Sequence, residues 1–250
     1  MLALVLTVLI FPLLYSYYNS RTSANQTTTA VFDKFLSNKQ PEIKILLYHY
    51  VENVTDERDF IRESLNTPPS LFEKQLQQFI NSDYEFIFAS EIPNVDVKLD
   101  KKYAVITFDD GYEDYYTDAF PILKRLGLKS TNYIVYNFIG KPNYMNKNQI
   151  SELVNSGLVE IGSHTLNHLD LTSISLKDAV YEIQRSKELL ERDYKVSITS
   201  FCYPYGFYDT EIIKAVVKAG YTNGVASSTG KVNNLQNLFK LPRVKMGKTL

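Results

Sequence analysis

The chain has 250 residues, 44% of them hydrophobic and 22% charged, which suits one sizeable globular domain with a buried core or two small ones. The formal net charge is -1 and no block of Lys or Arg stands out. This balance argues against nucleic acid as a partner and favours a neutral ligand over a polyanion. The single cysteine, Cys202, excludes an intramolecular disulfide.

The first 20 residues form a hydrophobic segment, with no charged side chain before Arg21. Its length lies between that of a signal-peptide core and that of a membrane-spanning helix. We expect residues 1–20 to be a signal or anchor segment, residues 21–42 a linker, and residues 43–250 the folded domain. Either interpretation of the segment places the domain outside the cytoplasm, secreted or anchored to the membrane. A buried helix of the domain is the alternative.

From residue 43 onward, short apolar runs alternate with amphipathic segments. Strands are predicted at residues 43–48, 84–88, 103–108, 131–136, 159–161, 198–202, 221–226 and 239–244. Helices are predicted at residues 70–80, 113–126, 147–156, 176–192 and 210–219, the first opened by a capping box of Ser70 and Glu73. This alternation predicts a parallel α/β sheet whose seven or eight strands form a closed or nearly closed, distorted (β/α) barrel. An open doubly wound sheet is the competing architecture.

The chain has only three histidines, and all of them follow predicted strands, as does a pair of carboxylates. These residues are His49, Asp109, Asp110, His164 and His168. In parallel α/β folds, active sites lie at the carboxyl ends of the strands. We therefore expect residues far apart in the sequence to gather on one face of the sheet.

Asp109 and Asp110 stand side by side where an apolar run ends, and two like charges raise the pKa of one or both. One carboxylate can bind a cation, whose charge keeps it ionised, while the other takes a proton from metal-bound water. Taken alone, Asp-Asp-Gly is more typical of a turn or of a helix cap, with Asp110 capping the helix near Glu113.

His164 and His168 have an H-x3-H spacing, which places both imidazoles on one side of a helix or of a tight turn. Two histidines and one aspartate make a three-ligand metal site with open positions for water and substrate. Two polar loop histidines are the alternative. The neighbouring carboxylate pair favours the metal.

The stretch FCYPYGFYD combines Pro204, which fixes the backbone, with Gly206, which permits a tight turn. Such a loop can aim a backbone N–H at a developing oxyanion. The alternative is an ordinary turn between strand and helix, with Asp209 as the helix N-cap. Among the many aromatic residues of these loops, Tyr205 and Tyr144 are our candidates for a substrate cleft.

The chain resembles a known family in three stretches, TFDDGYEDYYTDAFPILKRLGLKSTNYIV, EIGSHTLNHLDL and FCYPYG. The family is that of the polysaccharide deacetylases with a NodB homology domain, carbohydrate esterase family 4, and the resemblance covers residues 43–246. It implies a distorted (β/α) barrel and a divalent metal, usually zinc, with cobalt, nickel, iron or manganese as alternatives. The reaction it implies is hydrolysis of the N-acetyl group from N-acetylglucosamine units.

Carried over by position, the resemblance implies that Asp109 is the general base. It implies that Asp110, His164 and His168 bind the metal. It also implies that the backbone N–H of Tyr205 helps to hold the oxyanion. The chemistry agrees, because a metal can both polarise the poorly electrophilic amide carbonyl and lower the pKa of the attacking water.

The chain departs from the family's pattern at several points. Position 202 is a cysteine where many members have an arginine, VASSTG at 225–230 lacks an expected Asp and Trp, and the tail lacks the histidine that is often the general acid. His49 in LLYHYV is similar to an early histidine of the branch acting on poly-β-1,6-N-acetylglucosamine, the biofilm exopolysaccharide. We expect His49 to be the general acid, with a structural histidine as the alternative. Arg243 is a candidate for the missing arginine beside Asp109.

We therefore expect a metal-dependent polysaccharide N-deacetylase that releases acetate from an N-acetylglucosamine polymer. Exopolysaccharide of the poly-β-1,6 type is favoured, and chitin- or peptidoglycan-type substrates stay open. A non-catalytic glycan-binding barrel is a second hypothesis. A two-His-one-carboxylate iron oxygenase is a third, and the α/β pattern disfavours it.

Overall fold

A computed structural model describes residues 41–54, 60–95, 101–229 and 237–247. The predicted signal or anchor segment and nearly all of the predicted linker lie outside these ranges. Within them, no helix is both long enough and apolar enough to cross a membrane.

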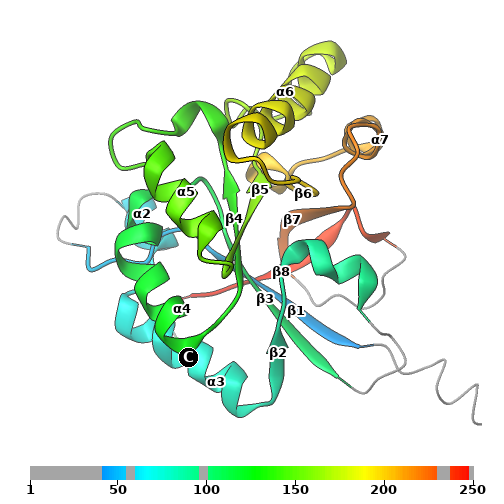
Figure 1. The fold of residues 1–250 in the computed structure, drawn as a ribbon. Coiled ribbons are helices and arrows are strands. Elements are labelled where there is room, and N and C mark those ends of the chain that lie inside the picture. The colour runs from blue at the N-terminus through cyan, green and yellow to red at the C-terminus, as the bar shows by residue number, and fades with distance from the viewer. Residues whose placement is uncertain (1–40, 55–59, 96–100, 230–236, 248–250) are drawn as a thin grey trace, which may run out of the picture. The chain divides into compact units, whose positions relative to one another are not determined.

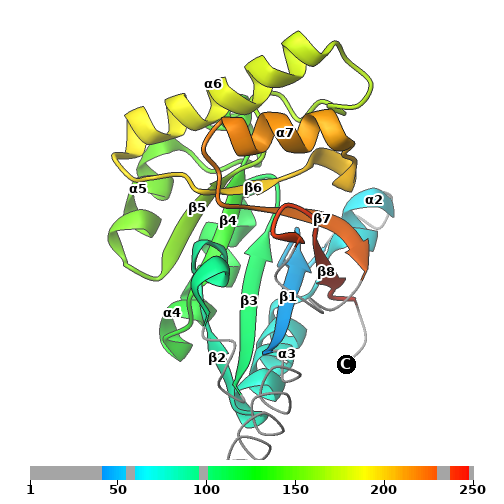
Figure 2. The same cartoon turned by 90° about the vertical axis from the view of Figure 1, so that its right-hand side faces the viewer.

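Eight strands form one parallel sheet in the described part of the chain (Figures 1 and 2). They are β1 (Glu42–Tyr48), β2 (Tyr84–Phe86), β3 (Lys102–Phe108), β4 (Ser130–Ile134), β5 (Val159–Ser163), β6 (Ser200–Cys202), β7 (Asn223–Thr229) and β8 (Leu241–Lys245). Each of the eight predicted strands has its counterpart, with ends that differ by up to three residues.

The sheet closes into a barrel. The strand order is β1-β8-β7-β6-β5-β4-β3-β2, and β1 also pairs with β3 along its whole length, from Glu42 with Lys102 to Tyr48 with Phe108. β2 pairs only with the first residues of β3, whereas β4 pairs with the last ones, so β2 is an extra strand beside a ring of seven. The predicted (β/α) barrel is confirmed, and the β1–β3 pairing excludes the open doubly wound sheet.

The core consists of two hydrophobic clusters, one inside the barrel and one between the barrel and the helices. The inner cluster takes alternate residues of the strands, among them Ile43, Ile45, Val105 and Tyr133. Neighbouring positions such as Leu46 and Ile106 belong to a larger cluster shared with the helices. Because side chains alternate across a strand, buried apolar runs are what a strand covered on both faces requires.

The helices lie around the barrel (Figure 1). They are α2 (Phe60–Leu65), α3 (Pro69–Asn81), α4 (Phe120–Leu126), α5 (Lys147–Asn155), α6 (Leu176–Tyr194) and α7 (Thr210–Lys218). Ser175 caps α6 by accepting the N–H of Asp178, and Asp209 caps α7 by accepting that of Ile212. Gly127 ends α4 in the left-handed conformation, as expected for a helix C-terminus.

Three local expectations need correction. The capping box of Ser70 and Glu73 is wrong, because α3 starts at Pro69, with Pro68 as its N-cap residue and no side-chain cap. Proline suits the first helical position, since its φ is preset and its missing N–H is not needed there. The helix predicted at residues 113–126 contains a π-helical turn, Tyr115–Ala119, ahead of α4. The short helix α2 has no counterpart among the predicted elements.

Candidate active site

The carboxyl ends of the strands bring together residues that are far apart in the sequence. Asp110 follows β3, and His164 follows β5. Asp110 Oδ1 lies 3.5 Å from His164 Nε2 and 3.4 Å from His168 Nε2. The three side chains each offer a ligand atom, and these atoms all lie within 4.8 Å of one another. We call them the metal cluster.

Backbone turns aim the three side chains at one point. Asp110 has φ 73° and Gly111 φ 80°, so the chain reverses directly after β3. His164 Nδ1 lies 2.8 Å from the carbonyl oxygen of Cys202, to which it donates, and its Nε2 is left facing Asp110. His168 also has a positive φ of 58°, and its backbone N–H donates to Thr165 Oγ1. The H-x3-H spacing therefore lies on a turn after a strand and not on a helix.

The metal cluster fits a divalent cation. Asp110 Oδ1 is buried and makes no hydrogen bond within the described residues, a costly state for an oxygen that a cation would satisfy. Burial lowers the pKa of both His164 and His168, which favours the neutral imidazoles that bind metals. Burial, together with the neighbouring Asp109, raises the pKa of Asp110. One carboxylate oxygen and two imidazole nitrogens are a donor set typical of catalytic zinc sites.

Asp109 points to a different partner. Its two carboxylate oxygens accept hydrogen bonds of 2.7 Å each from Nη1 and Nη2 of Arg243, a fully buried residue of β8. Arg243 Nε also donates to the carbonyl of Ala226, which fixes the guanidinium plane. Burial alone would raise the pKa of Asp109, but the Arg243 charge more than offsets it and holds that pKa well below its usual range. Asp109 is therefore ionised at neutral pH.

His49 also lies close to Asp109. Its Nε2 lies 3.9 Å from Asp109 Oδ2, and its side chain is 19% exposed. Burial lowers the pKa of His49, whereas the Asp109 carboxylate acts in the opposite direction. The structure thus places His49, Asp109 and the metal cluster in one site.

Comparison with known proteins agrees with this geometry. Residues 96–224 match the polysaccharide deacetylase family. The Bacillus subtilis protein YxkH, which is named for that family, is 32% identical over 213 residues, 84% of this chain and 73% of YxkH. The chain belongs to the polysaccharide deacetylase family.

Two further proteins that are similar to this chain are also named as deacetylases. The poly-β-1,6-N-acetyl-D-glucosamine N-deacetylase of Staphylococcus aureus is 26% identical over 84% of this chain and 81% of that protein. The structure of the Streptococcus pyogenes deacetylase PplD in complex with acetate superposes with a TM-score of 0.76 at 27% identity, over 83% of this chain and 93% of PplD. This polysaccharide deacetylase is thus a hydrolase acting on non-peptide carbon–nitrogen bonds.

The third motif of the deacetylase forms a short turn beside the metal cluster. Pro204–Gly206 make one 3-10 turn in which Tyr205 has φ 58° and ψ 0°. A Cβ at position 206, where φ is +75°, would lie 2.6 Å from the backbone nitrogen of Ser227. Asp209 is the N-cap of α7, as the sequence predicted for a turn between strand and helix. The ring of Tyr205 meets His168 edge to face at 4.7 Å.

Two groups of aromatic rings lie in the loops that follow the strands of the deacetylase. Tyr112 stacks between Tyr50 and Tyr144, with ring centroids 4.0 and 4.9 Å apart. The faces of these stacked rings are largely used against one another. Tyr205 and Phe207 are instead 57% and 55% exposed, so they can offer ring faces to a sugar. The sequence predicted Tyr144 and Tyr205 as cleft residues; Phe207 was among the loop aromatics but was not a cleft candidate, and Tyr50 was in neither group.

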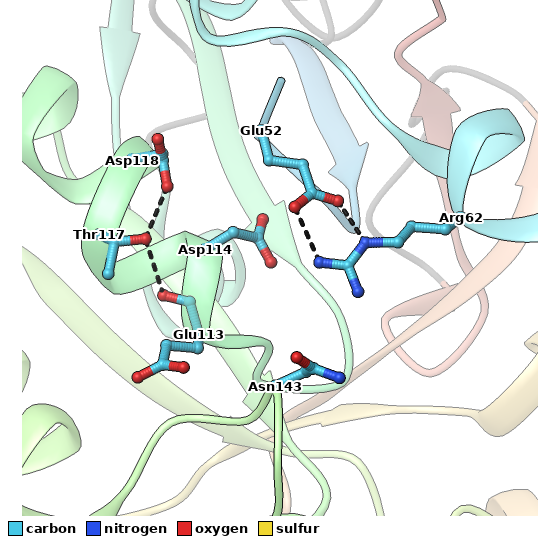
Figure 3. Close-up of a pocket in the computed structure, with 7 residues that line it drawn as sticks. All are labelled: Glu52, Arg62, Glu113, Asp114, Thr117, Asp118 and Asn143. Atoms are coloured by element: carbon cyan, nitrogen blue, oxygen red, sulfur yellow. Dashed lines mark hydrogen bonds and ion pairs between the residues drawn. The ribbon is translucent and has the colours of Figure 1, made fainter. Parts of the chain in front are cut away.

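A separate polar pocket of the deacetylase is lined by Glu52, Arg62, Glu113, Asp114, Thr117, Asp118 and Asn143 (Figure 3). Arg62 forms an ion pair with Glu52 and covers the ring of Tyr50. Asp114 Oδ2 accepts the backbone N–H of Val51 at 2.6 Å, and burial raises the pKa of Asp114 to about 7. None of the predicted catalytic residues lines this pocket.

Proposed function

We propose that this polysaccharide deacetylase removes N-acetyl groups from a polymer of N-acetylglucosamine, of the poly-β-1,6 type, and releases acetate. The observation that carries the proposal is a buried, ionised Asp109 beside a cluster of one carboxylate and two imidazoles. The likeness to the Staphylococcus aureus enzyme and the position of His49 support the choice of polymer. Chitin- and peptidoglycan-type polymers are the alternative substrates.

Asp110, His164 and His168 would hold a divalent ion, with zinc the best match to one oxygen and two nitrogen donors. When bound, such an ion supplies Lewis-acid polarisation of the acetamide carbonyl and a lowered pKa for the attacking water. Asp109 is the general base: the Arg243 charge keeps its carboxylate ionised at neutral pH, so it can accept a proton from that water. Arg243 positions Asp109 through both carboxylate oxygens.

Two further groups complete the reaction. The backbone N–H of Tyr205, held between Pro204 and Gly206 in a strained turn, stabilises the oxyanion. His49 donates a proton to the departing amine as general acid. Its Nε2 is 3.9 Å from Asp109 Oδ2, so acid and base stand side by side. Burial lowers the pKa of His49, and the Asp109 charge opposes that shift.

We further propose that the enzyme acts outside the cytoplasm, since its polymer substrate is extracellular. The support is the hydrophobic run at residues 2–14. Its role as a signal or anchor segment stays a prediction, because these residues lie outside the described ranges. Whether residues 1–20 are cleaved or retained as an anchor is testable from the N-terminal sequence of the mature protein.

The decisive experiment is acetate release from defined polymers by the metal-loaded enzyme. General acid–base groups contribute roughly 10²–10⁴-fold to a rate, so Asp109→Asn should lower kcat by about that factor while leaving polymer binding intact. Full activity of Asp109→Asn would remove the general base from the proposal. Polymer binding by the wild type without any acetate release would favour the non-catalytic glycan-binding barrel.

A further inference from the structure

The loop that carries the two metal-cluster histidines has a strained backbone. Thr165 has φ 67° and His168 has φ 58°, and neither residue is a glycine. Residues with a side chain adopt this left-handed conformation at an energetic cost, and they keep it only where surrounding contacts impose it. The contacts that impose it here therefore decide where His168 points.

One side chain from another element makes three of these contacts. Glu182 of α6 accepts the backbone N–H of Leu166 at 3.0 Å and that of Asn167 at 2.8 Å, both on Oε2. Its Oε1 accepts Nδ2 of Asn167 at 2.6 Å. One carboxyl group thus closes three hydrogen bonds on two consecutive residues of the loop.

The segment after β4 also holds the loop. The N–H of Tyr136 donates to the carbonyl of Thr165, and the N–H of Asn137 donates to the carbonyl of Leu166. The side chain of Asn137 also donates to Oδ1 of Asn167. The segment after β4 and Glu182 therefore both hold the loop, and Glu182 is the side chain that accepts hydrogen bonds from the loop's backbone.

The place of Glu182 in its helix is unusual for a carboxyl group. It is 4% exposed and stands on the buried face of α6, which packs beside β5 (Figure 1) with Ala179, Ile183 and Leu190. Burying a carboxyl group is costly unless it is hydrogen-bonded, and all three of these hydrogen bonds go to the one loop between His164 and His168. An apolar residue would serve helix packing as well.

We propose that Glu182 is a positioning residue of the metal cluster. It holds the His164–His168 loop so that His168 Nε2 faces Asp110 Oδ1 at 3.4 Å. The inference rests on the proposed metal role of these histidines. Groups that orient metal ligands from outside typically contribute 10–100-fold to metal affinity, so Glu182→Ala should weaken zinc binding by about that factor.

The test measures zinc affinity of the full chain by competition with a chromogenic chelator, together with the visible absorption spectrum of the cobalt-loaded protein. Glu182→Gln is the second variant. Its amide oxygen can still accept the two backbone N–H groups, but its NH2 faces the donor of Asn167, so its zinc affinity should lie between wild type and Glu182→Ala. Glu191→Gln is the matched control, because Glu191 also stands on α6 and accepts a backbone N–H, that of Ile198, away from the metal cluster.

The expected result is about 10–100-fold weaker zinc binding and an altered cobalt spectrum for Glu182→Ala, a smaller loss for Glu182→Gln, and wild-type values for Glu191→Gln. Wild-type affinity in both Glu182 variants would overturn the positioning role and leave the proposed function standing. An equal loss in Glu191→Gln would also overturn it, because a general weakening of α6 would then explain the effect. A wild type that binds no zinc or cobalt would overturn both this inference and the proposed metal site. Should Glu182→Ala not fold, Glu182→Gln decides alone.

Discussion

The buried pair of Asp109 and Arg243 makes a prediction that separates structure from chemistry. Arg243→Leu removes the guanidinium and leaves the Asp109 carboxylate 3% exposed and without its bidentate partner. Breaking a buried pair by removing one partner costs about 3–5 kcal/mol, and we expect the free energy of unfolding to fall by that amount at pH 7. Burial is then no longer offset, so the pKa of Asp109 rises and the base requires a higher pH.

The contribution of Asp109 to stability depends on pH in opposite directions in the wild type and in Arg243→Leu. In the wild type the pKa of Asp109 is lowered by folding, so the pair's stabilisation is present above the unfolded pKa and is lost as the pH falls through the folded one. In Arg243→Leu the folded pKa is raised, and stability falls as the pH rises through it. Urea unfolding of both proteins over a range of pH should therefore show a gap that widens from acid to neutral pH.

A surface pair provides the control. Arg125 makes the same bidentate contact with Glu73, at 3.1 and 2.9 Å, but their side chains are 53% and 41% exposed. Exposed pairs contribute about 0–1 kcal/mol, so Arg125→Leu should be nearly neutral. Adding Asp109→Asn to Arg243→Leu should recover part of the stability without recovering deacetylation. If Arg243→Leu cost no more than Arg125→Leu, or if the double variant showed no coupling, the reasoning would be refuted.

Three other predictions address the pocket, the third motif and the metal. Folding raises the pKa of Asp114 to about 7, so the stability that its protonated carboxyl contributes is complete below the unfolded-state pKa and is lost as the pH rises through 7. In urea unfolding between pH 4 and 8, the wild type should therefore lose on the order of 4 kcal/mol of unfolding free energy relative to Asp114→Asn. A pH-independent difference would contradict this. Gly206→Ala should destabilise the protein more than Gly220→Ala in thermal unfolding, because a Cβ at 206 would lie 2.6 Å from Ser227 N while one at 220 has nothing within 4 Å. Equal melting temperatures would show that the turn yields freely. Removing metal with a chelator should abolish acetate release and lower the unfolding temperature, and zinc should restore both; undiminished release from metal-free protein would exclude a catalytic metal.

The barrel strands, and the grouping of the candidate site residues at their carboxyl ends, were predictable because both depend on local sequence patterns. The apolar run before Asp109 is a strand buried on both faces, as its composition indicates. Parallel strands share one carboxyl edge, which is why Asp109, Asp110 and His164 could be placed together without any contact information. The H-x3-H spacing added His168, although it left open whether a helix or a turn carries the two histidines.

Contacts across the barrel were beyond reach of such patterns. Arg243 lies 134 residues from Asp109, and its being buried depends on how β8 and β3 are registered around a closed ring. Only the arginine missing at position 202 suggested it. There is geometric sense in the exchange: Cys202 Sγ lies 3.3 Å from Arg243 Nη2, so the cysteine leaves space in which a guanidinium from another strand reaches the same carboxylate. Glu182 had a weaker signal, a charged residue on the apolar face of a helix.

The backbone explains why the motifs could be recognised but not drawn in advance. Asp110, Thr165, His168 and Tyr205 all have φ between 58° and 73°, and each belongs to one of the three motif stretches. Such residues are costly for the fold, so their concentration at one edge of the barrel indicates that the direction of side chains and N–H groups matters more there than local stability. A left-handed backbone conformation can be predicted from the sequence where a glycine adopts it, as at Gly111, but not where an aspartate or a histidine adopts it. Hydrogen bonds from distant elements then have to impose the turn, and they are the contacts whose loss should weaken the site before it weakens the fold.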